Sequence, residues 1–321
     1  MQVLAPPDPP SVRALTDLVD RATAALGHAA LSEHKCIELG RLVQARAPSG
    51  PADGSVAVVA RRTVGSALVG YAHVSHDHGA DASPFATELV VDPGVASGPE
   101  GAAAVADALL DAVVAEVATR GGGTLRLWVS KAGEADDARA SAHGFGPERD
   151  LIQMRCPLPL PRRSGTAGES VSVETRPFRP GLDEDAWLAT NNRAFATHPE
   201  QGHWELGTLI EREAEPWFDP EGLLLFEHDG RLAGSCWTKV HRETDPPMGE
   251  IYVIGVDPDF HGRGWGRALT QAGLDHLASE GLTVGMLYVD AANRAAVSMY
   301  RSMGFVDDHV DRAYVRSVGP A

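Results

Sequence analysis

The sequence has little positive charge and no long apolar run, and each shortage removes a class of protein. Its 321 residues carry 28 lysines and arginines against 44 aspartates and glutamates, for a formal net charge of −16. A nucleic-acid surface needs clustered cations to contact phosphates, so we expect no nucleic-acid partner. No apolar run approaches the roughly 20 residues that span a bilayer, so we expect no membrane partner either.

Cysteine is also scarce. Cys36, Cys156 and Cys236 are scattered and form no CxxC pair. An odd, sparse set indicates reduced thiols, as in the cytoplasm. Residues 1–10 are proline-rich and contain neither a basic region nor an apolar run, so we expect them to be loose and to form no signal peptide. These features predict a cytoplasmic protein.

Potential metal ligands gather at one predicted strand end, where His73, His76, Asp77 and His78 follow one another closely. Their spacing matches no established ligand pattern, and no second ligand cluster accompanies them. We therefore expect no metal.

The length allows two domains, each with its own core. Apolar periodicity and turn residues predict elements in similar order in both halves. The first half is expected to form helices at 11–26, 33–42, 101–118 and 134–142, and strands at 56–60, 67–74, 88–91, 124–129 and 151–156. The second half is expected to form helices at 182–195, 203–213, 265–279 and 294–302, and strands at 171–176, 223–227, 231–239, 249–256, 284–289 and 313–317.

A stretch rich in Pro, Gly and Ser, 157–170, reads as a linker between domains 1–156 and 171–321. Short strings recur on either side of it. Val91-Asp92-Pro93 matches Val256-Asp257-Pro258, and His143-Gly144-Phe145 matches Met303-Gly304-Phe305 at nearly the same offset. These matches predict a tandem duplication.

The most informative stretch is 249–269, GEIYVIGVDPDFHGRGWGRAL. An apolar strand ends at Asp257-Pro258, a turn with Gly262, Gly264 and Gly266 follows, and a helix begins. Free N–H groups in such a turn, together with the helix dipole, form an anion cradle. The ligand is therefore expected to carry phosphate.

The spacing His261-x-x-Gly264-x-Gly266 resembles the pyrophosphate loop of the GNAT superfamily of N-acetyltransferases, although that family usually has Gln or Arg at the first position. A second GNAT pattern, N-x-x-A-x-x-x-Y-x-x-x-G-F, begins at Asn293 and ends at Phe305. The resemblance implies an α/β (α+β) protein of two tandem GNAT-type domains. Each would be a mixed, mostly antiparallel twisted sheet flanked by helices.

Acetyl-CoA is the co-substrate that this resemblance implies. The matching positions are Ile254, Gly255, Val256, His261, Gly262, Arg263, Gly264, Trp265, Gly266, Arg267, Asn293, Arg294, Ala295, Ala296, Val297 and Ser298. The first-half counterparts of the strand are Leu89, Val90 and Val91. The first-half loop has Pro99, which lacks an amide donor, and Glu100, which would repel phosphate. Ala140 stands where the second half has Tyr300. We therefore expect the first domain to be catalytically silent.

Amine acylation assigns roles to particular residues. The attacking amine must lose a proton, and Glu250 at the start of the central strand is the candidate base. A backbone N–H of residues 254–256 would stabilise the oxyanion. Tyr300, at the family's position for this role, would protonate the departing thiolate.

The strings at 151–158, 198–202, 237–241 and 249–253 resemble a tandem-domain subgroup that acetylates the cysteinyl amine of a sugar conjugate. This resemblance implies a small-molecule amine substrate and a monomer. It assigns substrate contacts to Glu33, Glu200, Lys239, Glu250 and Tyr288. Two alternatives stay open: acetylation of another small amine, such as an antibiotic or a polyamine, and an acyl-CoA sensor without turnover.

Overall fold

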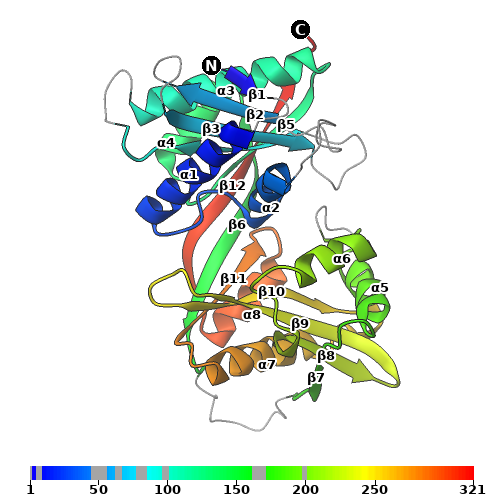
Figure 1. Ribbon diagram of the computed structural model, residues 1–321. Helices are drawn as coiled ribbons and strands as arrows, with labels where there is room; N and C mark the ends of the chain where they lie inside the picture. The colour runs from blue at the N-terminus through cyan, green and yellow to red at the C-terminus, as the bar shows by residue number, and fades with distance from the viewer. Residues whose placement is uncertain are drawn as a thin grey trace. The chain divides into compact units, whose positions relative to one another are not determined.

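The computed structural model describes residues 2–4, 9–44, 56–61, 67–76, 85–95, 101–160, 171–196 and 201–321. The chain divides into two compact units (Figure 1). Unit 1 comprises Met1–Asp150 and Val310–Ala321, and unit 2 comprises Leu151–His309.

Unit 1 is a sheet in the order β1-β2-β3-β4-β5-β12, with β4 and β5 parallel and its other adjacent pairs antiparallel. Its elements are β1 (Gln2–Leu4), α1 (Pro9–Leu26), α2 (Glu33–Gln44), β2 (Val56–Arg61), β3 (Leu68–His76), β4 (Phe85–Val91), α3 (Ala102–Thr119), β5 (Gly123–Val129), α4 (Glu134–Ala142) and the C-terminal part of β12 (Val306–Val318).

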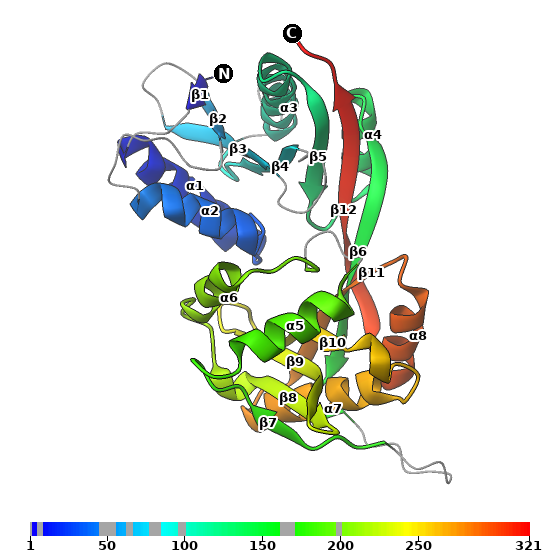
Figure 2. The same ribbon diagram turned by 90° about the vertical axis from the view of Figure 1, so that its right-hand side faces the viewer.

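Strand alternation separates two cores in unit 1, because successive side chains point to opposite faces. Val56 and Val58 of β2 pack with the α3 face, whereas Ala57 and Val59 pack with α1. Figure 2 shows α1 and α2 on one side of β3 and β4, and α3 on the other. One face of α1 is apolar and buried, and its members are Val12, Leu15, Leu18, Val19 and Ala22.

Unit 2 repeats this design in the order β6-β11-β10-β9-β8-β7, with β10 and β11 parallel. In Figure 1, α5 and α6 lie on one side of β8, β9 and β10, and α7 lies on the other. The elements are β6 (Gly146–Pro157), β7 (Thr175–Pro177), α5 (Glu184–Ala194), α6 (Leu206–Glu213), η1 (Pro220–Gly222), β8 (Leu223–His228), β9 (Arg231–His241), β10 (Met248–Val256), η2 (Pro258–Phe260), α7 (Trp265–Ser279), β11 (Val284–Asp290) and α8 (Arg294–Met303).

The two halves of the chain exchange strands, so the units do not coincide with the expected domains. The C-terminal part of β12 pairs with β5 in unit 1, from Arg312↔Val129 to Val318↔Gly123. Residues 151–157 of β6 pair with β11 in unit 2. The unit boundary therefore falls at Asp150, before the expected linker at 157–170, most of which lies outside the described residues.

Most predicted elements are confirmed, and the helices at 134–142 and 265–279 match at both ends. The strand predicted at 171–176 is wrong, because β7 covers only Thr175–Pro177. Residues 2–4 form β1 instead of a loose segment, since they pair with β2. β12 begins at Val306, well before the predicted start at Ala313. Across the described segments, no helix is long and apolar enough to cross a membrane.

Candidate active site

A fork between two parallel strands forms the centre of unit 2. β10 and β11 pair from Met248↔Val284 to Ile251↔Leu287, although β10 continues to Val256 and β11 to Asp290. On its other edge β10 stays paired with β9 as far as Val256↔Gly234, with a register shift between Ile251 and Val253. The β11-facing edge of β10 is therefore open beyond the last pair, where its backbone groups can bind a ligand.

The loop after β10 leads directly into α7. Gly262 and Gly264 have φ values of 78° and 79°, a left-handed conformation that side chains with a Cβ rarely adopt. His261 Nε2 lies 2.9 Å from the carbonyl oxygen of Val256, which ties the loop to the strand end. The first N–H groups of α7, beginning at Trp265, have no partner within the helix. Loop and helix thus have the backbone geometry on which the predicted anion cradle depends.

The glycines of the loop differ in how closely other atoms approach them. A Cβ added at Gly262 or Gly266 would meet no other atom within 4 Å. By contrast, a Cβ at Gly255 would lie 3.1 Å from the Cβ of Ala194 and 3.3 Å from the Phe195 ring. Gly255 therefore lets the end of α5 pack closely against β10 behind the fork.

The cation side chains of the cradle are held by their neighbours. The Arg263 guanidinium lies 5.5 Å from the centroid of the Phe260 ring and 5.2 Å from that of Trp265. Arg267 donates to the Ser302 hydroxyl of α8. The Trp265 side chain is buried, so its expected part in ligand binding falls to its backbone N–H.

The start of α8 contributes the second GNAT pattern. Asn293 caps this helix, because its Oδ1 accepts from the N–H of Ala296 at 3.2 Å. The exposed members of the expected set are Asn293, Arg294, Ala295 and Ser298, whereas Ala296 is half-buried and Val297 is buried.

Tyr300, further along α8, is buried against Phe305, with ring centroids 5.7 Å apart. Burial, with a smaller contribution from the Cys236 thiol, raises the pKa of Tyr300. Its phenol therefore stays protonated at neutral pH and keeps a proton to donate.

Glu250 is buried in β10, with its side chain 10% exposed. Its Oε2 lies 2.7 Å from Nε2 of His241 at the end of β9, and the other ring nitrogen, Nδ1, lies 2.9 Å from Oε1 of Glu243. Burial lowers the pKa of His241, but the hydrogen bonds and charges of the carboxylates outweigh it, and the net pKa is raised.

Lys239 lies beside Glu250, because the two residues are directly paired across β9 and β10. Such partners share a face of the sheet. Lys239 Nζ lies 4.5 Å from the centroid of the Trp217 ring and 5.4 Å from that of Tyr252. Two aromatic faces thus hold the ammonium on the Glu250 face.

Tyr288 of β11 is 39% exposed and belongs to a polar chain across β11 and β6. Gln153 Nε2 donates to its hydroxyl at 2.7 Å, and Arg155 Nε donates to Gln153 Oε1 at 2.9 Å. Arg155 in turn lies 3.1 Å from Asp308. Because Tyr288 follows Met286, the partner of Glu250, by two residues, Tyr288 and Glu250 share one face.

The remaining predicted residues lie elsewhere or outside the described ranges. Glu33 begins α2 in unit 1, and Leu89, Val90 and Val91 end β4 there. Glu200 lies outside the described residues. Within those ranges, no group of three or more metal-ligating side chains is placed to hold a metal ion. Asp77 and His78 of the predicted histidine-rich group lie outside them, as does the first-half loop at 96–100.

Reasoning from sequence missed His241 and Gln153. His241 follows Lys239 by two residues in the same strand, so it shares the face of Lys239 and Glu250. That spacing could have revealed it. Gln153 could not be found in this way, because its contact with Tyr288 depends on the pairing of β6 with β11.

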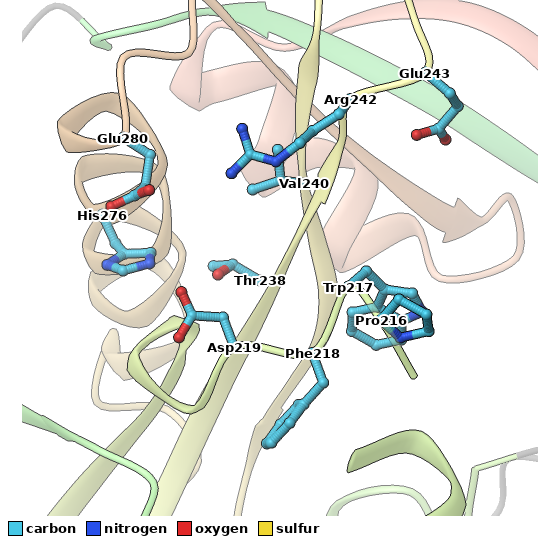
Figure 3. A pocket seen from close by; sticks show the side chains of 10 residues that line it. All are labelled: Pro216, Trp217, Phe218, Asp219, Thr238, Val240, Arg242, Glu243, His276 and Glu280. Atoms are coloured by element: carbon cyan, nitrogen blue, oxygen red, sulfur yellow. The ribbon is translucent and has the colours of Figure 1, made fainter. Parts of the chain in front are cut away.

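A cavity of about 440 Å³ lies between α7, β9 and the segment before η1. Figure 3 shows His276 and Glu280 of α7 across from Trp217, with Thr238 and Arg242 between them. Thr238 precedes Lys239, so its side chain points to the opposite face of β9 from the Glu250 group. The residues predicted for substrate or acetyl-CoA binding do not line this cavity.

Comparison with known proteins shows which family has this fold. Residues 185–305 match the model of the acetyltransferase (GNAT) family. A GCN5-related N-acetyltransferase from Sphaerobacter thermophilus has a similar structure over 100% of this chain and 96% of its own, with a TM-score of 0.66 and 21% identity. A tandem GNAT protein from the clavulanic acid pathway covers 99% of this chain and 98% of its own, with a TM-score of 0.63 and 19% identity.

The fold is therefore of the GNAT class, and part of the second half matches the family model. A mycothiol acetyltransferase from Thermomonospora curvata is 42% identical over 308 residues, 95% of this chain and 93% of its own. Another, from Thermobispora bispora, is 47% identical over 257 residues, 78% of this chain and 81% of its own. The chain belongs to the mycothiol acetyltransferase family.

Proposed function

We propose that this protein transfers the acetyl group of acetyl-CoA to the cysteinyl amine of cysteinyl-glucosaminyl-inositol, which yields mycothiol and CoA. The observation that supports this most is the fork between β10 and β11, with a buried carboxylate at its base and an anion cradle at its mouth. The choice of substrate rests on family membership, since a relative similar over nearly the whole chain is named mycothiol acetyltransferase.

Acetyl-CoA would bind through the open edge of β10 and the loop before α7. Amides of Gly262 to Arg267 would hold the pyrophosphate, because a glycine turn at a helix N-terminus offers several N–H groups to an anion. Arg263 and Arg294 would add positive charge at the exposed rim. These donors suit a phosphate ligand even in a protein with a net charge of −16.

Direct transfer would proceed through a tetrahedral intermediate. Glu250 would take a proton from the substrate ammonium, which frees the nitrogen lone pair to attack the thioester carbon. A backbone N–H of residues 254–256 would stabilise the oxyanion that forms. When the carbon–sulfur bond breaks, Tyr300 would donate its proton to the thiolate, and the second proton that the nitrogen loses as the amide forms would restore the phenol.

The substrate would lie on the face that carries Glu250, Lys239 and Tyr288. Lys239, held over two rings, can donate hydrogen bonds to sugar or inositol hydroxyls without leaving its place. The Tyr288 hydroxyl, already bound by Gln153, has a fixed position for the same purpose. A polyol with one ammonium group fits this mixture of donors and one buried carboxylate.

Release of CoA thiol, measured with acetyl-CoA and a panel of amines, tests the function. We expect the specificity constant for cysteinyl-glucosaminyl-inositol to exceed that for glucosaminyl-inositol or spermidine by more than about a hundredfold, because a site built for particular polar groups penalises their loss strongly. Equal or better turnover of the polyamine would refute the substrate assignment. No thiol release with any amine would refute the enzyme.

A further inference from the structure

His241 connects a buried carboxylate to an exposed one. Glu250 is 10% exposed at its side chain, His241 16% and Glu243 65%. The two ring nitrogens of His241 lie 2.7 Å from Glu250 Oε2 and 2.9 Å from Glu243 Oε1. Glu250, His241 and Glu243 therefore form a continuous hydrogen-bonded line from the base of the fork to solvent.

Two protons are needed to make both contacts hydrogen bonds, because carboxylates only accept and a neutral imidazole donates from one nitrogen. Either the ring is an imidazolium between two carboxylates, or the ring is neutral and one carboxyl is protonated. The line can therefore store a proton at the ring or at either carboxyl.

Other groups around His241 leave this line intact. From β9, the nearby cation is Lys239, whose charge opposes protonation of the ring. From β10, the titratable group is Glu250, beside Met248, which pairs directly with His241. From the following turn come Glu243 and the Thr244 hydroxyl, which donates to the His241 carbonyl oxygen at 3.1 Å. The ring thus has two carboxylates and one ammonium near it, so the charges around it favour its protonation.

We propose that His241 is a positioning residue that fixes the Glu250 carboxylate and conducts the substrate's proton to solvent through Glu243. This inference rests on the proposed acetyl transfer. That reaction converts an ammonium and a thioester into an amide and a thiol, so one proton must leave at each turnover. Glu250 first takes that proton. The neutral ring, with its proton on Nδ1, then releases that proton to Glu243 and solvent while Nε2 accepts the proton from Glu250. Glu250 is again ionised, and the ring regains its starting tautomer when Nδ1 takes up a proton from solvent and Nε2 gives one up.

The test compares His241→Gln and Glu243→Gln with the unaltered protein and with His143→Gln. The control is matched, since His143 of unit 1 also lies between two carboxylates, with nitrogens 3.1 Å from Asp111 and 3.3 Å from Asp107. His143 is 13% exposed, close to the 16% of His241. CoA thiol release would be measured from pH 5.5 to 9, with cysteinyl-glucosaminyl-inositol as the amine.

We expect His241→Gln to lower kcat by about tenfold to a hundredfold, which is less than the roughly 10²- to 10⁴-fold of a direct acid or base, because Glu250 remains. The KM for acetyl-CoA should stay within about twofold, because the cradle is untouched. Protonation of the ring fills Nε2 and stops the transfer, so the acid limb that this protonation causes should be absent from the His241→Gln profile. Glu243→Gln should lower kcat by about threefold to tenfold, since the ring keeps its contact with Glu250 but loses its exit.

A further variant, His241→Gly, separates conduction from a structural role. Added imidazole should restore at least about tenfold of its lost kcat, as a diffusible ring can take the missing position. A pH profile of His241→Gln that parallels that of the unaltered protein, or no rescue by imidazole, would overturn the proposal. If the unaltered protein and His143→Gln also fail to release thiol, the proposed function itself is wrong.

Discussion

The two units carry the same fork with different chemistry. In unit 1, β4 and β5 pair in parallel from Phe85↔Leu125 to Glu88↔Trp128, and β4 continues to Val91. In unit 2, β10 and β11 separate in the same way after Ile251↔Leu287. The two units thus share the separation of the parallel strands, and the side chains beside it can be compared.

The carboxylates at the two forks differ in what they bind. Glu88 uses both oxygens on Ser32, accepting from its N–H at 2.7 Å and from its hydroxyl at 2.5 Å. Glu88 therefore anchors the start of α2. Glu250 uses Oε2 on a histidine that leads to an exposed carboxylate. One carboxylate holds a helix in place, and the other can exchange protons.

The helix-covered faces differ as well. In unit 1, Lys35 and Glu38 of α2 form a buried polar cluster with His73 of β3. Glu38 Oε2 lies 3.1 Å from Lys35 Nζ and 2.8 Å from His73 Nε2. In unit 2, the matching face is aromatic, and Trp237 lies 5.5 Å from Trp187 and 5.9 Å from Trp217 between ring centroids. The two units therefore have the same strand order but differ in the residues on the faces that the helices cover.

The largest expected effect separates the two fork carboxylates. Glu250→Gln should lower kcat by about 10²- to 10⁴-fold, because the amine loses its base. Acetyl-CoA affinity, measured by calorimetry, should change by less than about twofold. Glu88→Gln is the control and should leave kcat unchanged while it lowers thermal stability. Equal losses of kcat in both variants would mean that the two forks do not differ in the proposed way.

A smaller effect is expected at the tyrosine of α8. Tyr300→Phe should lower kcat by about tenfold or more with unchanged acetyl-CoA affinity, because the phenol acts only as the thiolate departs. The control is Tyr314→Phe in unit 1, where the hydroxyl contacts Asp137 at 2.7 Å. Single-turnover thiol release measures both. A Tyr300→Phe enzyme that keeps its full rate would remove the acid from the mechanism.

The smallest effect concerns two histidines whose pKa values are shifted in opposite directions by folding. Burial lowers the pKa of His73 despite the opposing Glu38 hydrogen bond, so its stabilising contribution is present above its ordinary pKa near 6.5 and is lost as pH falls toward the folded value. The raised pKa of His241 gives a contribution that is present below about 6.5 and is lost as pH rises through the folded value.

Hydrogen exchange of β3 and β9 amides, corrected for intrinsic rates, should therefore show opposite pH dependences between pH 5 and 7.5. Each group can contribute a slope of at most about 1.4 kcal/mol per pH unit. His73→Gln should flatten the β3 slope, and His241→Gln should flatten the β9 slope. Parallel slopes in both units would contradict the assigned shifts.

Local patterns predicted much of this fold. The helix at 265–279 was predictable because apolar residues recur with helical spacing after a glycine turn, and the cradle followed from Gly262 and Gly264. The strand at 171–176 failed because β-prone residues there have little sheet to join: β7 meets β8 over only a few residues. The structure of that segment therefore depends on its pairing partners and not on the β propensity of its residues.

The candidate site was predictable only where side chains follow a strand or a helix by fixed spacing. Glu250 and Lys239 could be placed at the ends of adjacent strands, whereas their direct pairing required the hairpin register. The partners of Tyr288 depended on β6, which sequence reasoning assigned to the other domain. Long-range pairing of that kind leaves no trace in local periodicity.

The exchanged strands also set an order for biosynthesis. Residues 310–321 are made after unit 2, yet they belong to unit 1, whose other residues are made before it. Unit 1 therefore cannot complete its sheet until those residues have been made. Until then, the edge of β5 that pairs with β12 stays unpaired. Unit 2 has no such delay, since residues 151–157 of β6 precede β11. Unit 2 is expected to complete its sheet first, and unit 1 only after residues 310–321 have been made.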